Sequence, residues 1–217
     1  MWTSPDGVTW SRVPHDEAVF GGGGWQQMAS VIAGGPGLVA VGVDWSGDFD
    51  AAVWTSPDGI TWSRVPHDEA VFGGAGSQLM ESVTAGGLGV VAVGLAGLDG
   101  LFDAAVWTSP DGITWSRVPH NEAVLGGGVQ MFDVTAGGPG LVAVGSAGFG
   151  GLPFAAVWTS PDGITWSRVP HDEAVFGGGG WQYMSGVTAG GPGLVAVGYD
   201  LSGEDGDAAV WVEAPER

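Results

Sequence analysis

Four histidines of this chain stand beside carboxylates. His15, His67, His120 and His171 are each followed by Asp or Asn and then by Glu. Imidazole nitrogens and carboxylate oxygens bind divalent metals and carry out general acid–base chemistry. Adjacent residues of an extended chain point opposite ways, so one stretch does not chelate alone, whereas a ring of symmetry-related histidines could. We expect these residues to cap and satisfy a long loop, with no bound metal and no cofactor.

The chain also contains 12 tryptophans. Most of them recur at fixed repeat positions, and we expect these to pack between sheets. Trp25, Trp45 and Trp181 fall outside those positions, in segments predicted to be loops, where an indole can stack on a sugar ring or a small flat ligand. These three tryptophans and the four histidines are the candidate ligand-binding residues.

The residues needed for covalent catalysis are missing from the pattern. The chain has no Cys, and no nucleophile–base pair occurs only once among the repeats. The glycine runs lack the Lys of a phosphate-binding loop. The oxygen-rich segments 44–50 and 200–207 do not fit the EF-hand spacing. The sequence therefore predicts no catalytic residues, and we expect the protein not to be an enzyme.

The positions of these residues are set by an internal repeat. The hexapeptide Trp-Thr-Ser-Pro-Asp-Gly begins at Trp2, Trp54, Trp107 and Trp158, and a truncated copy ends the chain near Trp211. The steps between these tryptophans are 52, 53, 51 and 53 residues. Such a period indicates one supersecondary unit arranged as an array. A residue shared by every copy is first a structural residue.

One repeat reads as four strands joined by turns. In the third copy the predicted strands are 129–136, 141–145, 154–159 and 164–169, all rich in β-forming residues and separated by Gly-rich turns. The glycine density argues against helices, so the fold class is all-β. A four-stranded unit of this length fits a β-propeller blade in a single domain, 1–217. The predicted blades are 25–65, 77–118, 129–169, and 182–212 completed by 8–13.

Ser-Pro-Asp-Gly predicts the hairpin before the fourth strand. Pro fixes φ at the second turn position, Asp tolerates the third, and Gly takes the left-handed conformation after it. With the following Ile-Thr-Trp, as in 56–62, this segment resembles the Asp-box of sialidase-type β-propellers (the bacterial neuraminidase repeat), which runs Ser-x-Asp-x-Gly-x-Thr-Trp. Here one residue is missing between Asp and Gly, and the resemblance covers about seven residues of each copy.

The resemblance implies architecture and not activity. In that family the box is a fold element, whereas catalysis uses an arginine triad and a tyrosine nucleophile with an acidic partner. Here the four internal arginines occupy one equivalent position per repeat, and Tyr occurs only at Tyr183 and Tyr199. Glycoside hydrolysis is therefore the least favoured function.

The two ends of the chain suggest how the array closes. The outer strand 8–13 and the three strands within 182–212 together make one blade, an arrangement known as Velcro closure. Closure gives either a four-bladed monomer or, if two chains exchange ends, an eight-bladed ring. Four blades must turn ~90° per step and eight only ~45°. The small residues of the inner strands suit the smaller angle between neighbouring blades, so we favour the homodimer that forms the eight-bladed ring.

The net charge of the chain limits the classes of partner that it can bind. The net charge is −19, and all five cations are Arg. Binding phosphates requires clustered cations, so we expect no nucleic-acid and no membrane partner. Nothing in the sequence indicates a compartment. The leading interpretation is a non-enzymatic, self-assembling propeller scaffold, and the near-identical copies suggest an engineered repeat protein or a fragment of a longer array. The alternative is a lectin-like module that binds a glycan or small molecule on its loop face.

Overall fold

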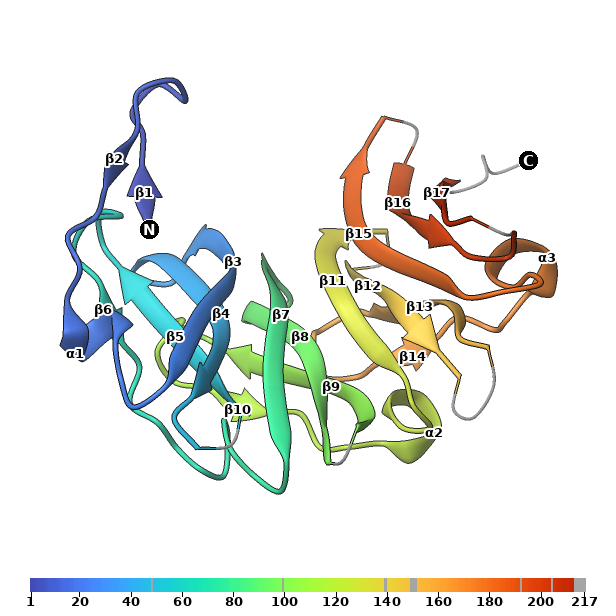
Figure 1. Cartoon of the computed structure of the whole chain (residues 1–217), viewed down its shortest axis with the longest axis horizontal. Coiled ribbons are helices and arrows are strands. Elements are labelled where there is room, and N and C mark those ends of the chain that lie inside the picture. The colour runs from blue at the N-terminus through green and yellow to red at the C-terminus, as the bar shows by residue number, and fades with distance from the viewer. Residues whose placement is uncertain are drawn as a thin grey trace.

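The structure, a computed structural model, describes residues 1–47, 49–98, 100–138, 140–148, 152–191, 193–203 and 205–212. Its strands form antiparallel sheets that follow one another along the chain (Figure 1). A two-stranded sheet holds β1 (Trp2–Thr3) and β2 (Ser11–Arg12). The first four-stranded sheet holds β3 (Trp25–Gly34), β4 (Gly37–Trp45), β5 (Phe49–Ser56) and β6 (Ser63–Arg64).

The next two sheets repeat this order. The second contains β7 (Ser77–Gly86), β8 (Gly89–Leu98), β9 (Leu101–Ser109) and β10 (Ser116–Arg117). The third contains β11 (Gln130–Gly137), β12 (Gly140–Ala147), β13 (Phe154–Ser160) and β14 (Ser167–Arg168). The last sheet has three strands, β15 (Gln182–Gly190), β16 (Gly193–Asp200) and β17 (Asp207–Val212). The expectation of an all-β protein is confirmed.

The sheets stand side by side in an open arc (Figure 1). The first strand of each sheet packs on the sheet before it: β7 contacts β3, β4 and β5, and β15 contacts β11, β12 and β13. The hairpin β1–β2 lies at one end of the arc and the sheet β15–β17 at the other (Figure 1). This arrangement is consistent with a propeller-like fold, but the array is not closed.

The Velcro closure is not seen in the single chain. The segment 8–13 was expected to complete the last sheet, whereas β2 pairs with β1, joining Trp2 to Arg12 and Thr3 to Ser11. The same register joins Trp54 to Arg64 inside the first four-stranded sheet. The hairpin β1–β2 is therefore the outer half of a blade, and closure stays a prediction.

Short helical turns replace the loop expected after three of the four outer strands, β2, β10 and β14, whereas the segment 69–72 after β6 is a hydrogen-bonded turn. The helical turns are α1 (Glu17–Phe20), α2 (Glu122–Leu125) and α3 (Glu173–Phe176). Asp16 shows the cause, because its carboxylate accepts a hydrogen bond from the backbone of Ala18 at 2.9 Å and caps the first turn. Among the described residues, no helix is long and apolar enough to cross a membrane.

The Ser-Pro-Asp-Gly turn is held by its own side chains. In the second sheet, Ser109 Oγ accepts from the backbone N–H of Gly112 at 2.8 Å, and Gly112 has the expected left-handed φ of 77°. Asp111 Oδ1 accepts from the backbone N–H groups of Ile113 and Thr114 at 2.8 and 2.6 Å. Because the carboxylate takes these N–H groups, the fourth strand shrinks to the two residues of β10, shorter than predicted.

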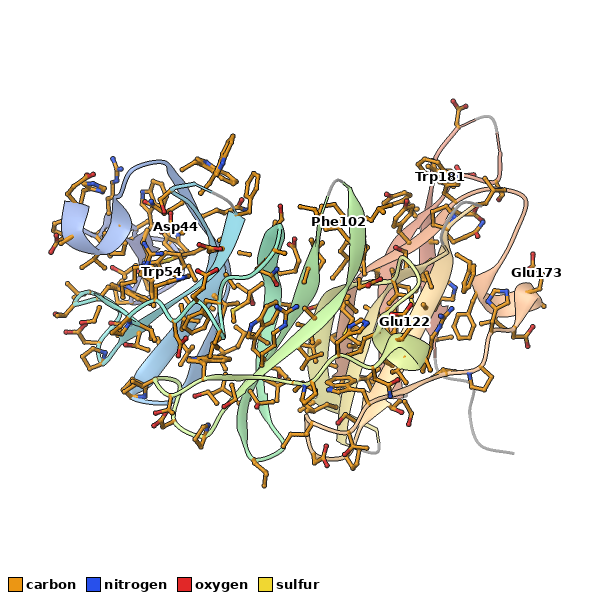
Figure 2. The ribbon with its side chains drawn as sticks, turned by 90° about the horizontal axis from the view of Figure 1, so that it is seen from below. Asp44, Trp54, Phe102, Glu122, Glu173 and Trp181 are labelled. Carbon is orange, nitrogen blue, oxygen red and sulfur yellow. The ribbon has the colours of Figure 1, made fainter. Side chains whose placement is uncertain are left out.

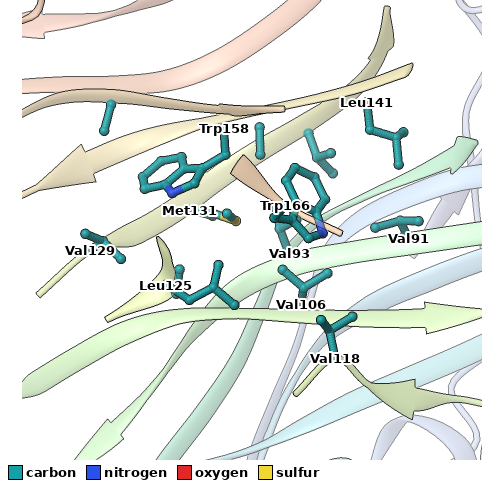
Figure 3. Close-up of a cluster of buried hydrophobic side chains, with 14 of the residues drawn as sticks. Val91, Val93, Val106, Val118, Leu125, Val129, Met131, Leu141, Trp158 and Trp166 are labelled. Carbon is teal, nitrogen blue, oxygen red and sulfur yellow. The ribbon is translucent and has the colours of Figure 1, made fainter. Parts of the chain in front are cut away.

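The core lies between consecutive sheets and not within one sheet. Figure 3 shows the junction of the second and third sheets, where Val91 and Val93 face Leu141 and Trp158. The same positions meet at the preceding junction, where Val39 and Val41 pack with Val90, Ala92 and Trp107. Each sheet thus uses one side of every strand to cover its predecessor and the other to cover its successor.

Tryptophans fix each sheet to the connection before it. The indole N–H of Trp107 donates to the carbonyl of Val71 at 2.7 Å, and Trp158 donates to Val124 at 2.9 Å. Both side chains are buried, which confirms the packing predicted for these repeat positions. A buried indole that kept no partner would lose about 1–3 kcal/mol, so the hydrogen bond fixes how the sheets meet.

The aspartates of the Ser-Pro-Asp-Gly turns are expected to make the fold less stable in acid. Hydrogen bonds from the backbone of Thr114 and Ile113 lower the pKa of Asp111 below 3.8, and those from Thr9 and Val8 lower that of Asp6 to about 2. A lowered folded-state pKa stabilises the fold above pH 3.8, and this contribution is lost as pH falls through the folded value. We expect Asp111→Asn to be less stable at pH 7 and to show a weaker dependence on pH between about 4 and 2.

Urea unfolding at a series of pH values measures this slope. Glu81→Gln is the matched contrast, because burial raises the pKa of Glu81 above 4.5. Its ionisation costs stability as pH rises through that range, so the neutral amide should gain stability at pH 7. Equal pH dependence in Asp111→Asn and the wild type would show that the carboxylate of this turn does not stabilise the fold.

Candidate functional site

The histidines lie in separate clusters, one in each loop that follows an outer strand. His67 Nε2 is 3.2 Å from Glu69 Oε2 and 3.9 Å from Asp50 Oδ2. His120 is placed in the same way, 3.1 Å from Glu122 Oε2 and 3.9 Å from Asp103 Oδ2. In each cluster one imidazole and two carboxylates lie within 4.8 Å of one another, a set that can surround one divalent cation.

The other two copies change this cluster. Phe154 stands where Asp50 does, and its ring centroid lies 4.2 Å from that of His171. At the start of the chain, His15 is 2.9 Å from Glu17, and this hydrogen bond lowers the pKa of Glu17. The four histidines therefore do not converge on one point. Asp48 and Glu204, from the oxygen-rich segments considered for calcium, lie outside the described residues.

The three candidate tryptophans are not all brought together. Trp25 and Trp45 are cross-strand partners at the ends of β3 and β4, not loop residues, and Trp45 stacks on Phe49 with centroids 4.7 Å apart. Trp181 precedes β15 and has its centroid 6.4 Å from that of Tyr183. All three indoles are about half exposed. Trp181 lies at the far end of the arc from the other two (Figures 1 and 2).

The feature missed from the sequence is the outward face of the last sheet. Val197 is 47% exposed, although its equivalent in the first sheet, Val41, is fully buried. Val210 is 65% exposed, against 1% for its equivalent Val53. These residues have the type and position of core residues, but within the part of the chain that the structure describes no sheet covers them. Exposed apolar patches of this kind mark interaction surfaces.

The opposite end of the array presents the complementary face. Val31 of β3 is 57% exposed, whereas its equivalent in the second sheet, Val83, is 3% exposed. A cavity of about 640 Å³ separates this face from the hairpin β1–β2. Its lining includes Met28, Val31, Leu38, Ala40, Trp54 and Val13. In the second sheet, the equivalents of Met28, Leu38 and Ala40 contact the preceding sheet.

A carboxylate on the second strand distinguishes the end sheets from the middle ones. Asp44 on β4 accepts from Arg64 on β6 and from Gln26 at 3.0 Å. Burial disfavours the Asp44 carboxylate, but these hydrogen bonds outweigh it and leave its pKa below 3.8. The last sheet has Asp200 at this position, whereas the two middle sheets have Ala96 and Ala147. Comparison of the four copies could have revealed this signal.

Comparisons with known proteins add little. No protein-family model matches the chain, and no characterised relative does. Among solved structures, it is similar to a candidate glycoside hydrolase from Parabacteroides distasonis, with 15% identity and a TM-score of 0.45. That match covers 96% of this chain and 76% of the other. A likeness this weak carries no argument about activity, so function must be inferred from the residues described above.

Proposed function

We propose that this protein is a non-enzymatic repeat scaffold that assembles through its two end faces into a closed β-propeller. The proposal is supported by one comparison within the chain. Val197 and Val210 are exposed, although the residues at the same positions of the preceding sheets form the core. Burying a valine side chain stabilises a structure by about 1.5–3 kcal/mol, so open faces favour association.

The two faces are complementary because the internal junctions already join them. At those junctions, the valines of one sheet pack on the small and aromatic residues of the next, as Val39 and Val41 do on Ala92 and Trp107. The last sheet offers the valines, and the first sheet offers the exposed Val31 beside Ala40 and Trp54, which are already buried in a cluster with Val13. Joining the ends would therefore repeat an interface that the chain makes three times.

The proposal predicts that a charge on the outward face prevents closure. In Val197→Asp, a carboxylate would enter a junction that is apolar in the other copies, at a cost of several kcal/mol. The edge strand 207–212 should then exchange its amide hydrogens faster, because its outer edge loses its partner. Hydrogen–deuterium exchange measures this difference.

Ile113→Asp is the matched control, since Ile113 is similarly exposed but directly follows the Ser-Pro-Asp-Gly turn of the second sheet, away from both end faces. It should leave the exchange of 207–212 unchanged. If the wild-type segment exchanged as fast as in Val197→Asp, the faces would stay open in solution and the proposal would be wrong.

A second candidate function is binding of a glycan or other flat ligand at the exposed aromatic pair. Trp45 and Phe49 stack beside the half-exposed Trp25 at one end of the first sheet. Such a surface suits the apolar face of a sugar. The observation supports binding and supplies no group for hydrolysis.

A glycan array read by quenching of tryptophan fluorescence tests this candidate. If a sugar binds there, Trp45→Ala should weaken binding at least tenfold and Trp181→Ala should not, because Trp181 lies at the other end of the chain. Absence of binding across the array, or equal loss in both variants, would remove this candidate.

A further inference from the structure

We infer that a second copy of this chain closes the array, with its sheet β15–β17 seated in the cleft between β3 and the hairpin β1–β2. This inference rests on the proposed function, because it names what covers the end faces. We call each contact between the sheet β15–β17 of one copy and this cleft of the other a seam. Two copies joined at two seams would form a ring with twofold symmetry.

The open arc argues against closure by the same chain. The three internal junctions use equivalent residues, so each turns the next sheet by a similar step. In a four-bladed ring, three such steps would place the fourth sheet against the first. Instead, β15–β17 and β3–β6 lie at opposite ends of the array (Figures 1 and 2). The last sheet is therefore better placed to contact the first sheet of a partner subunit than the first sheet of its own chain.

The strand order also fits an exchange between copies. Within the described residues, the sheet β15–β17 has three strands, and β2 has the position of a fourth strand beside β1, with no first or second strand paired to them. The internal register joins Thr55 to Ser63, so at a seam the partner's Val212 would pair with Ser11. At present Thr3 of β1 occupies that place. Closure thus replaces β1, a strand of two residues, with the longer β17 of the partner subunit.

Charges at the seam match those inside the first sheet. Arg64 pairs with Asp44 there, and by repeat position Arg12 would meet the partner's Asp200. Among the described residues no carboxylate forms an ion pair with Arg12, which lies 5.7 Å from the ring of Trp2. Asp200 accepts from Gln182 at 3.0 Å, just as Asp44 accepts from Gln26. The pair would fix the register of the seam.

Reversing these charges tests the register. Arg12→Glu and Asp200→Arg should each raise the dissociation constant of the dimer about tenfold. Both changes in one chain restore opposite charges at each seam and should recover most of the loss, as measured by sedimentation equilibrium. If the dissociation constant of the double variant rose by the product of the two single effects, Arg12 and Asp200 would not interact. The proposed seam would then be wrong.

The absence of native Cys permits a direct test by disulfide trapping. In the variant Ser11→Cys/Val212→Cys, closure by a second copy places the two thiols in neighbouring paired positions, within reach of a disulfide. We expect mild oxidation to give a covalent dimer on a non-reducing gel. The positive control is Thr55→Cys/Ser63→Cys, which has the same register inside one sheet and should form a disulfide within the monomer.

The other outcomes separate this inference from the proposed function. An internal disulfide in monomeric Ser11→Cys/Val212→Cys would mean that the chain closes on itself, which overturns the second copy and keeps the propeller. A ladder of higher multimers would overturn the two-copy ring and keep assembly through end faces. If the thiols stayed reduced while the control pair oxidised, both proposals would be wrong.

Discussion

The structure depends on burial of apolar side chains between neighbouring sheets. A strand exposes its residues alternately to two faces, and in these sheets both faces are apolar, with valines on one and alanine, leucine or tryptophan on the other. No sheet can bury both faces alone. Stability therefore comes from junctions between nearest neighbours, as in other repeat proteins. The same constraint leaves one unsatisfied face at each end of the array.

The remaining features keep these junctions uniform. The Ser-Pro-Asp-Gly turn ends the third strand of each four-stranded sheet at the same place, because Ser109 and Asp111, like their equivalents, bind the backbone of their own turn. The indole of Trp107 then ties its strand to the preceding connection. Side chains on the inner strands add hydrogen bonds across the junctions, as where Asp133 accepts from the backbone of Val187 at 2.7 Å. Gly186 occupies the position of Asp133 in the last sheet, so a seam would lack this bond and be weaker than an internal junction.

Much of the fold could be predicted from the sequence because it depends on local patterns repeated four times. The period, the all-β class and the left-handed Gly112 follow from spacing and turn chemistry. The helical turn after Asp16 was missed because a single turn has no apolar period, although Asp followed by Glu is a capping signal. Trp25, which follows four glycines, and Trp45, which lies in the variable segment 43–50, were assigned to loops, but the strands of the first sheet extend far enough to pair them.

The candidate site was less predictable, because a repeat gives the same residues at buried and exposed places. Val197 and Val41 have the same sequence context, and only the three-dimensional arrangement shows that one has a neighbouring sheet and the other does not. Asp200 is the exception, because it departs from Ala96 and Ala147 in the sequence itself. Pairing β1 with β2 could not be foreseen, since Trp2 and Trp211 are equivalent candidates for the same partner.

The central claim is that the end faces are covered by a second copy, and the solution mass tests it most directly. Multi-angle light scattering across a dilution series should give about twice the chain mass of 21.9 kDa, with no larger species at high concentration. A mass that stays at 21.9 kDa at every concentration would contradict the account.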